Sequence, residues 1–60
     1  MTGAELRRLR ERAGLRQVDL AKLAEIGVRT LIRWEQGEVE IPALAARGLR
    51  EIVEEVKRKK

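Results

Sequence analysis

Glycine and proline breakers divide this chain of sixty residues into four short segments, and they constrain its fold more than any other feature. Gly14 and Gly37 follow stretches in which apolar residues recur three or four positions apart, as on one face of a helix, and glycine commonly ends such helices. Gly27 ends a tight connection between two further helical stretches, and Pro42 suits the first turn of a helix. We therefore predict an all-α, compact four-helix domain over residues 1–60, with helices near 3–13, 17–24, 28–36 and 42–57, of which the last is the longest.

The composition limits how so small a domain can be stabilised. The chain contains no Cys and no His, so disulfides and the usual zinc sites are excluded. Stability must come from an apolar core, from helix caps or from a partner subunit. Thr2 and Glu5 have the spacing of a capping box at the start of the first helix. No apolar run approaches the length of a membrane span, so we expect a cytoplasmic protein without membrane partners.

The side-chain chemistry argues against catalysis. Thr2 and Thr30 provide the only hydroxyl groups, and Ser, Cys, His, Tyr and Asn are absent. A nucleophile with an oriented base cannot be assembled from this set in the usual way. We therefore expect a protein that is not an enzyme, with no cofactor, no metal and no evident small-molecule ligand.

The charge pattern suggests two different surfaces. The net charge is +4, with basic residues in excess over positions 1–36 and 57–60 and acidic residues in excess between them. This distribution fits one surface that faces a polyanion and another that does not, although ordinary solvated charge would fit as well. The basic residues 57–60 could bind phosphate, and a frayed, solvated end is the simpler interpretation.

Residues 17–36 have the organisation of a helix-turn-helix. Two short helices joined by the three-residue turn 25–27 must cross at a steep angle, and a small residue is needed where their backbones approach. Ala21 meets that need. Trp34 lies on the inner face of its helix, where a core role is more common than a stacking platform for bases. Other apolar residues suited to the helix contacts are Leu20, Ala24, Ile26 and Leu31.

This stretch and the helix before it resemble the Xre/Cro-like (phage lambda-repressor-like) family of helix-turn-helix DNA-binding proteins. The resemblance covers residues 6–37 and rests on LRRLRERAGL, Gln17, Leu20-Ala21, Ile26, Thr30-Leu31 and Trp34-Glu35-Gln36-Gly37, with a looser likeness at Ile41-Pro42. The chain departs from the family at three positions. The family favours Ser or Thr where this chain has Arg16 and again where it has Gly27, and it favours Gly where this chain has Glu25. The resemblance implies a lambda-repressor-like fold and a sequence-specific regulator of transcription that binds double-stranded DNA. It would repress a small operon, with its own operon as one candidate, and would be associated with the nucleoid through DNA.

The resemblance also implies roles for the third helix, which would lie in the major groove with its outward side chains at base edges. Those side chains are Val28, Arg29, Ile32 and Arg33. An Arg fork matches guanine O6 and N7, whereas phosphate contact or simple solvation is the alternative for both arginines. Val28 could touch a thymine methyl group or simply be exposed. The expected phosphate contacts are Arg16, Gln17, Thr30 and Gln36.

Two further pairings are expected. In the family, an Arg in the first helix pairs with a Glu near the end of the recognition helix, and Arg10 and Glu35 match those positions; direct contact of Arg10 with DNA is the alternative. The fourth helix has a stripe that could form a homodimer on an inverted-repeat operator, or could instead cover the chain's own core. The residues of this stripe are Ala45, Leu49, Ile52 and Val56.

A second class of function remains open. The chain could be a protein-interaction module of antitoxin-like type, in which the fourth helix binds a different protein and DNA binding is secondary. Binding of single-stranded RNA is disfavoured because exposed aromatic side chains are lacking. The salt dependence of duplex binding would separate a DNA-binding protein from the interaction module.

Overall fold

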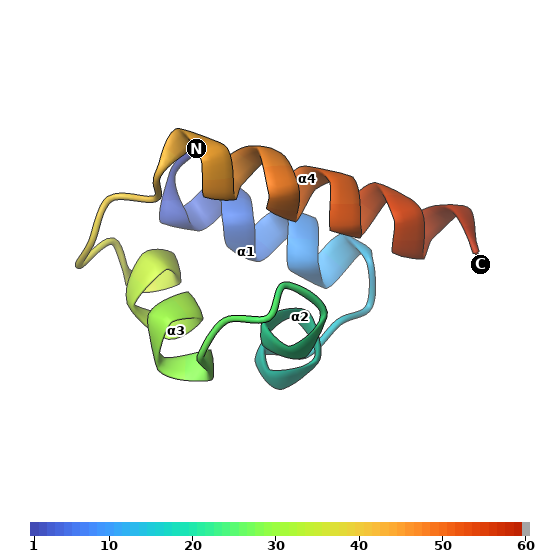
Figure 1. The fold of residues 1–60 in the computed structure, drawn as a ribbon, viewed down its shortest axis with the longest axis horizontal. Coiled ribbons are helices and arrows are strands. Elements are labelled where there is room, and N and C mark those ends of the chain that lie inside the picture. The colour runs from blue at the N-terminus through green and yellow to red at the C-terminus, as the bar shows by residue number, and fades with distance from the viewer. Residues whose placement is uncertain (60) are drawn as a thin grey trace.

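A computed structural model describes residues 1–59, and within them it has four helices and no strand. The helices are α1 (Gly3–Arg12), α2 (Gln17–Leu23), α3 (Val28–Gln36) and α4 (Ala43–Arg58). Helix α1 packs against both α3 and α4, and α2 packs against α3. Figure 1 shows α1 and α4 side by side along the long axis, with α2 and α3 below them. The predicted all-α fold is confirmed, with helix boundaries within one residue of those expected.

One buried side chain from each helix forms the centre of the core. Leu6, Leu20, Leu31 and Val53 are the largest side chains that are completely buried. Trp34 is 8% exposed and joins the same cluster, which confirms its predicted core role. Burying side chains of this size contributes about 1.5–3 kcal/mol each, so the four central residues make a substantial contribution to the stability of so short a chain.

The first helix begins with the predicted capping box. The backbone N–H of Glu5 donates to Thr2 Oγ1 at 3.1 Å, and the backbone N–H of Thr2 donates to Glu5 Oε1 at 3.4 Å. The fourth helix begins one residue later than expected, because Pro42 is its N-cap and not its first helical residue. It also ends one residue later than expected, so Lys57 and Arg58 are both helical, whereas a frayed end was the simpler interpretation of residues 57–60; Lys60 lies outside the described residues.

The first three helices end in the same way. After each one, a residue with positive φ reverses the chain: Gly14 (72°), Glu25 (56°) and Gly37 (78°). The N–H of the following residue then bonds back to a carbonyl in the last turn, as in a Schellman motif. Two of these residues are glycine, for which positive φ costs little, but Glu25 has a Cβ and is strained there by about 1–2 kcal/mol.

A close backbone approach joins the start of α1 to the end of α3. A Cβ placed on Gly3 would lie 2.5 Å from the carbonyl oxygen of Glu35 and would also overlap the carbonyl oxygen of Trp34. Both obstacles are backbone atoms, so neither can move aside without shifting a helix. Gly3 therefore sets how closely α3 lies against α1, a role that the sequence pattern did not reveal.

Candidate nucleic-acid interface

The crossing of α2 and α3 is built around a small residue and a strained turn. Ala21 is 3% exposed, as its predicted place at the helix approach requires, and its carbonyl accepts a hydrogen bond from the N–H of Ile26 at 3.0 Å. Ile26 is half-buried against the core. These contacts fix the direction in which α3 leaves the turn and therefore which of its faces points outward.

The outward face of α3 carries two arginines that the rest of the described chain leaves unpaired. Leu31, Trp34 and Glu35 are the buried residues of this helix, whereas Arg29 and Arg33 are exposed. Within residues 1–59, neither of these guanidinium groups takes part in an ion pair or a side-chain hydrogen bond. They are free to donate to a ligand.

The two apolar residues expected at base edges differ in accessibility. Val28 is 37% exposed at the first position of α3. It follows the N-cap residue Gly27, which has no side chain to cap the helix. Ile32 is half-buried, so only part of its side chain can reach a partner.

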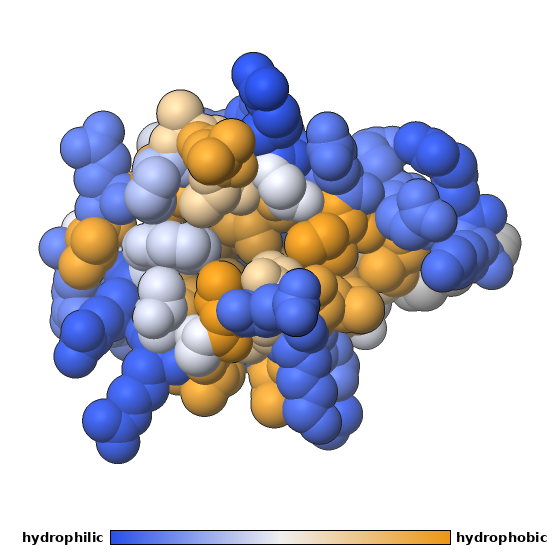
Figure 2. Space-filling view, viewed as in Figure 1, coloured by the Kyte–Doolittle hydropathy of each residue, from blue (hydrophilic) through white to orange (hydrophobic). Residues whose placement is uncertain are grey.

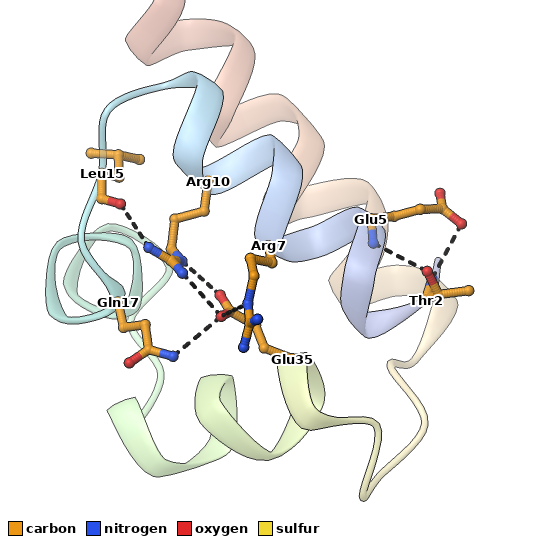
Figure 3. Close-up of polar contacts among 7 residues, drawn as sticks. All are labelled: Thr2, Glu5, Arg7, Arg10, Leu15, Gln17 and Glu35. Atoms are coloured by element: carbon orange, nitrogen blue, oxygen red, sulfur yellow. Dashed lines mark hydrogen bonds and ion pairs between the residues drawn. The ribbon is translucent and has the colours of Figure 1, made fainter.

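A buried carboxylate lies behind this face and joins three helices (Figure 3). The Glu35 side chain of α3 is 0% exposed, and its Oε2 accepts from Arg10 Nε of α1 at 2.7 Å. Its Oε1 accepts from Arg10 Nη2 at 3.1 Å and from Gln17 Nε2 of α2 at 3.2 Å. The Arg10–Glu35 pair is therefore bidentate, the strongest geometry that an arginine and a carboxylate can adopt.

The electrostatics of this cluster favour the ionised form of Glu35. Burial alone would raise the pKa of Glu35, but hydrogen bonds from Arg10 and Gln17, with the positive charges of Arg10 and Arg7, outweigh burial and hold that pKa below its ordinary value. Arg10 also donates from Nη1 to the carbonyl oxygen of Leu15 at 3.0 Å, which ties the loop between α1 and α2 to the same cluster. The pair thus fixes α1, that loop and α3 relative to one another.

The expected phosphate-contacting residues occupy different environments. Thr30 and Gln36 are exposed, whereas Gln17 is half-buried and already donates to Glu35. Arg16 is exposed, but its guanidinium donates to both carboxylate oxygens of Asp19, from Nε at 3.0 Å and from Nη2 at 3.1 Å. Its backbone N–H also donates to Asp19 Oδ2 at 3.0 Å, so Asp19 caps the start of α2. To reach a phosphate, Arg16 must exchange its bonds to Asp19 for new ones.

Sequence reasoning missed two residues of this region, Arg7 and Asp19. Asp19 stands three residues after Arg16, at the spacing from which a carboxylate reaches back to the N-cap N–H, so that spacing was the available signal. Arg7 Nε lies 3.6 Å from Glu35 Oε1. No local pattern marks Arg7, because the carboxylate it contacts is on another helix.

The family model for the helix-turn-helix domain matches residues 2–53. The chain belongs to the helix-turn-helix domain family. The match extends from the capping box of α1 into the second half of α4, and it includes α2, α3 and the turn between them. No curated protein and no solved structure matches the chain. This family membership supports DNA binding.

The stripe expected to form a dimer on α4 requires a correction at Leu49. Leu49 is 2% exposed and belongs to the core of this helix-turn-helix domain, because α4 packs with that side against the rest of the chain. Ala45, Ile52 and Val56 are half-buried. Ile52 and Val56 instead border an open groove of about 500 Å³ whose remaining lining residues are Leu23, Gly48, Glu51, Glu55 and Lys59. Figure 2 shows apolar surface between α4 and α2 on this face.

Residues 1–59 meet neither the requirements of a metal site nor those of a membrane-spanning helix. Within residues 1–59, no group of three or more acidic side chains lies close enough together to hold a metal ion. Among the same residues, no helix combines the length and the apolar character that crossing a bilayer requires.

Proposed function

We propose that this helix-turn-helix domain is a sequence-specific DNA-binding regulator of transcription. It represses a small operon, for which the operon that encodes the protein itself is one candidate. The observation that supports this proposal most directly is the outward face of α3, where Arg29 and Arg33 are exposed and unpaired among the described residues. Unpaired arginines on an exposed helix face match the fork geometry of guanine O6 and N7.

The remaining roles follow from the same placement. Val28 and the exposed part of Ile32 add apolar contacts at base edges, and Thr30 and Gln36 flank them as phosphate contacts. The Arg10–Glu35 pair is structural, because its atoms are consumed by one another and by Leu15 and Gln17. The likeness to the Xre/Cro-like family at Gln17 and Trp34–Gly37 supports the same docking. The absence of Ser, Cys, His, Tyr and Asn from the sequence supports a protein without catalytic activity.

The test is selection of bound sites from random duplex DNA, followed by fluorescence anisotropy on the selected site and on a scrambled duplex over a salt series. A specific regulator binds the selected site at least a thousandfold more tightly, by order of magnitude, and both affinities fall steeply as salt rises. The proposal fails if no duplex is bound even at low salt. Binding without any sequence preference would remove the repressor role and leave a general DNA-binding protein.

We further propose that the domain binds its operator as a homodimer through the α2–α4 groove. The apolar floor of the groove is formed by Leu23, Ile52 and Val56. Leu23 is 51% exposed, and the other two side chains are half-buried. Helix α4 is acidic in its middle, at Glu51 and Glu55, and basic at its end. Two copies packed antiparallel along α4 would therefore place the basic end of each helix beside the acidic middle of the other.

Dimerisation would correct a weakness of so small a DNA-binding domain, since one copy makes few phosphate contacts and two copies on an inverted repeat make twice as many. Analytical ultracentrifugation of the wild-type chain and of Leu23→Glu tests the interface, with Leu44→Glu as the control because Leu44 is 80% exposed and lies outside the groove. A dimer that only Leu23→Glu disrupts supports the proposal. A wild-type chain that is monomeric both free and on its operator contradicts it and favours a groove that receives a different protein.

A further inference from the structure

The carboxylate of Glu35 has more positive partners than its charge requires. Arg10 satisfies both of its oxygens with hydrogen bonds of 2.7 and 3.1 Å. Arg7 Nε lies 3.6 Å from Oε1, too far for a hydrogen bond, so it is attracted to the carboxylate without being consumed by it. Two arginines around a single carboxylate leave a net positive charge at this point of the surface.

Arg7 is the accessible member of this cluster. Its side chain is 53% exposed, while those of Arg10 and Glu35 are 11% and 0% exposed. In Figure 3, the Arg7 side chain descends from α1 beside Glu35, and Gln17 approaches the same carboxylate from α2. The excess positive charge of the cluster is therefore accessible to solvent, or to a ligand, at Arg7.

The position of this charge relative to α3 suggests what it meets. Arg7 Nε and Gln17 Nε2 lie 3.6 and 3.2 Å from the same atom, Glu35 Oε1, so a cation and an amide donor are neighbours at the junction of α1, the start of α2 and the last turn of α3. When a recognition helix lies in the major groove, the start of the preceding helix lies along the sugar–phosphate backbone that borders that groove.

We propose that Arg7, next to Gln17, forms a binding site for one phosphate of the DNA backbone, with the Arg10–Glu35 pair holding both side chains in place. This inference rests on the proposed DNA binding and adds to it a phosphate contact made from α1. Arg7 exchanges its long contact with Glu35 for a direct charge-assisted bond to a phosphate oxygen. The exchange costs little, because Arg10 and Gln17 remain bound to the carboxylate.

The test is the slope of log affinity against log salt concentration, measured by anisotropy with a short labelled duplex of mixed sequence. Arg7→Gln removes one phosphate contact, so the slope becomes shallower by about one unit and binding weakens by about eightfold at about 0.1 M salt. Arg7→Lys keeps the charge and restores the slope. The matched control is Arg8→Gln, which lowers the net charge equally from the next position on α1, at a groove shared with Leu9, Arg12 and Arg50 and away from Glu35.

Each outcome has a distinct meaning. A shallower slope for Arg7→Gln, with wild-type slopes for Arg7→Lys and Arg8→Gln, supports the phosphate site. If Arg7→Gln matches the wild type, or if Arg8→Gln changes the slope as much, the site is refuted although DNA binding stands. A loss in both Arg7 variants that accompanies a lower melting temperature assigns Arg7 to packing and refutes the site as well. If the wild-type chain binds no duplex, the proposed function and this inference fail together.

Discussion

Arg10 and Glu35 form a bidentate ion pair across twenty-five residues of sequence, with bonds of 2.7 and 3.1 Å, and the carboxylate side chain is 0% exposed. The pair joins α1 to α3 directly behind the face that we propose to bind DNA. Separating the two helices from this arrangement would leave a buried charge without its partner, so the pair favours the arrangement in which both charges are satisfied.

Removal of one partner of this pair should be costly. Arg10→Met leaves the Glu35 carboxylate buried with only Gln17 and the more distant Arg7, and we expect the free energy of unfolding to fall by about 3–5 kcal/mol. Urea denaturation followed by Trp34 fluorescence measures the change. The double variant Arg10→Met with Glu35→Leu is the control, since replacing both charges should recover much of the loss. An Arg10→Met protein as stable as the wild type would show that the pair is unimportant.

Acid should destabilise the fold through the same carboxylate. The pKa of Glu35 is lower in the folded state than in the unfolded chain, so ionised Glu35 stabilises the fold fully above its ordinary pKa of about 4.3. That contribution is lost as the pH falls through the lowered, folded-state pKa. Denaturation curves measured from neutral to strongly acidic pH should therefore show a decline in stability that Glu35→Gln greatly reduces.

The control for the acid experiment is Asp19→Asn. Asp19 also has a lowered pKa, because hydrogen bonds from Arg16 favour its ionised form, but it caps α2 at the surface and is not buried. Its variant should keep most of the decline. Equal declines in the wild type and in Glu35→Gln would mean that other carboxyl groups cause the acid sensitivity.

Two glycine-to-alanine changes should have opposite effects. Gly3→Ala forces a Cβ into the backbone carbonyls of Trp34 and Glu35, so we expect a loss of about 1–3 kcal/mol, in the range of overpacked sites. At Gly48, inside α4, a Cβ would meet nothing within 4 Å, and alanine should stabilise the helix by about 0.5–1 kcal/mol. Melting temperatures of the two variants test both signs, and a stabilised Gly3→Ala would refute the close approach.

Relief of the strained turn should stabilise the domain. Glu25 has a φ of 56°, where a Cβ is unfavourable, so Glu25→Gly should raise the free energy of unfolding by about 0.5–1 kcal/mol after the greater entropy of the unfolded glycine chain is deducted. Glu25→Ala keeps the Cβ and is the matched control, for which we expect no gain. If both variants melt at the same temperature, the strain at this turn is not significant.

The outward arginines of α3 should determine operator preference. Arg29→Ala and Arg33→Ala each remove a guanidinium group that has no partner within residues 1–59, so the fold should persist while discrimination between the selected and scrambled sites falls by about 1–3 kcal/mol. Arg47→Ala on α4 is the control for charge and should leave discrimination unchanged. Full sequence preference in both α3 variants would refute their assignment to base contacts.

The sequence by itself determined the features that depend on neighbours along the chain. The capping box of Thr2 and Glu5 and the helix end at Gly37 both arise within a few residues, so local spacing was enough to predict them. The outward placement of Arg29 and Arg33 also follows from helical periodicity once Leu31 and Trp34 are placed in the core.

Only the tertiary structure decided the features that depend on how helices meet. The stripe on α4 looked like a single seam, but the angle at which α4 packs buries Leu49 and leaves Ile52 and Val56 beside a groove. Gly3 and Arg7 have no local signal, because the atoms they approach belong to α3, far away in sequence. Periodicity defines the faces of a helix, whereas the packing of the other helices determines which part of each face is buried.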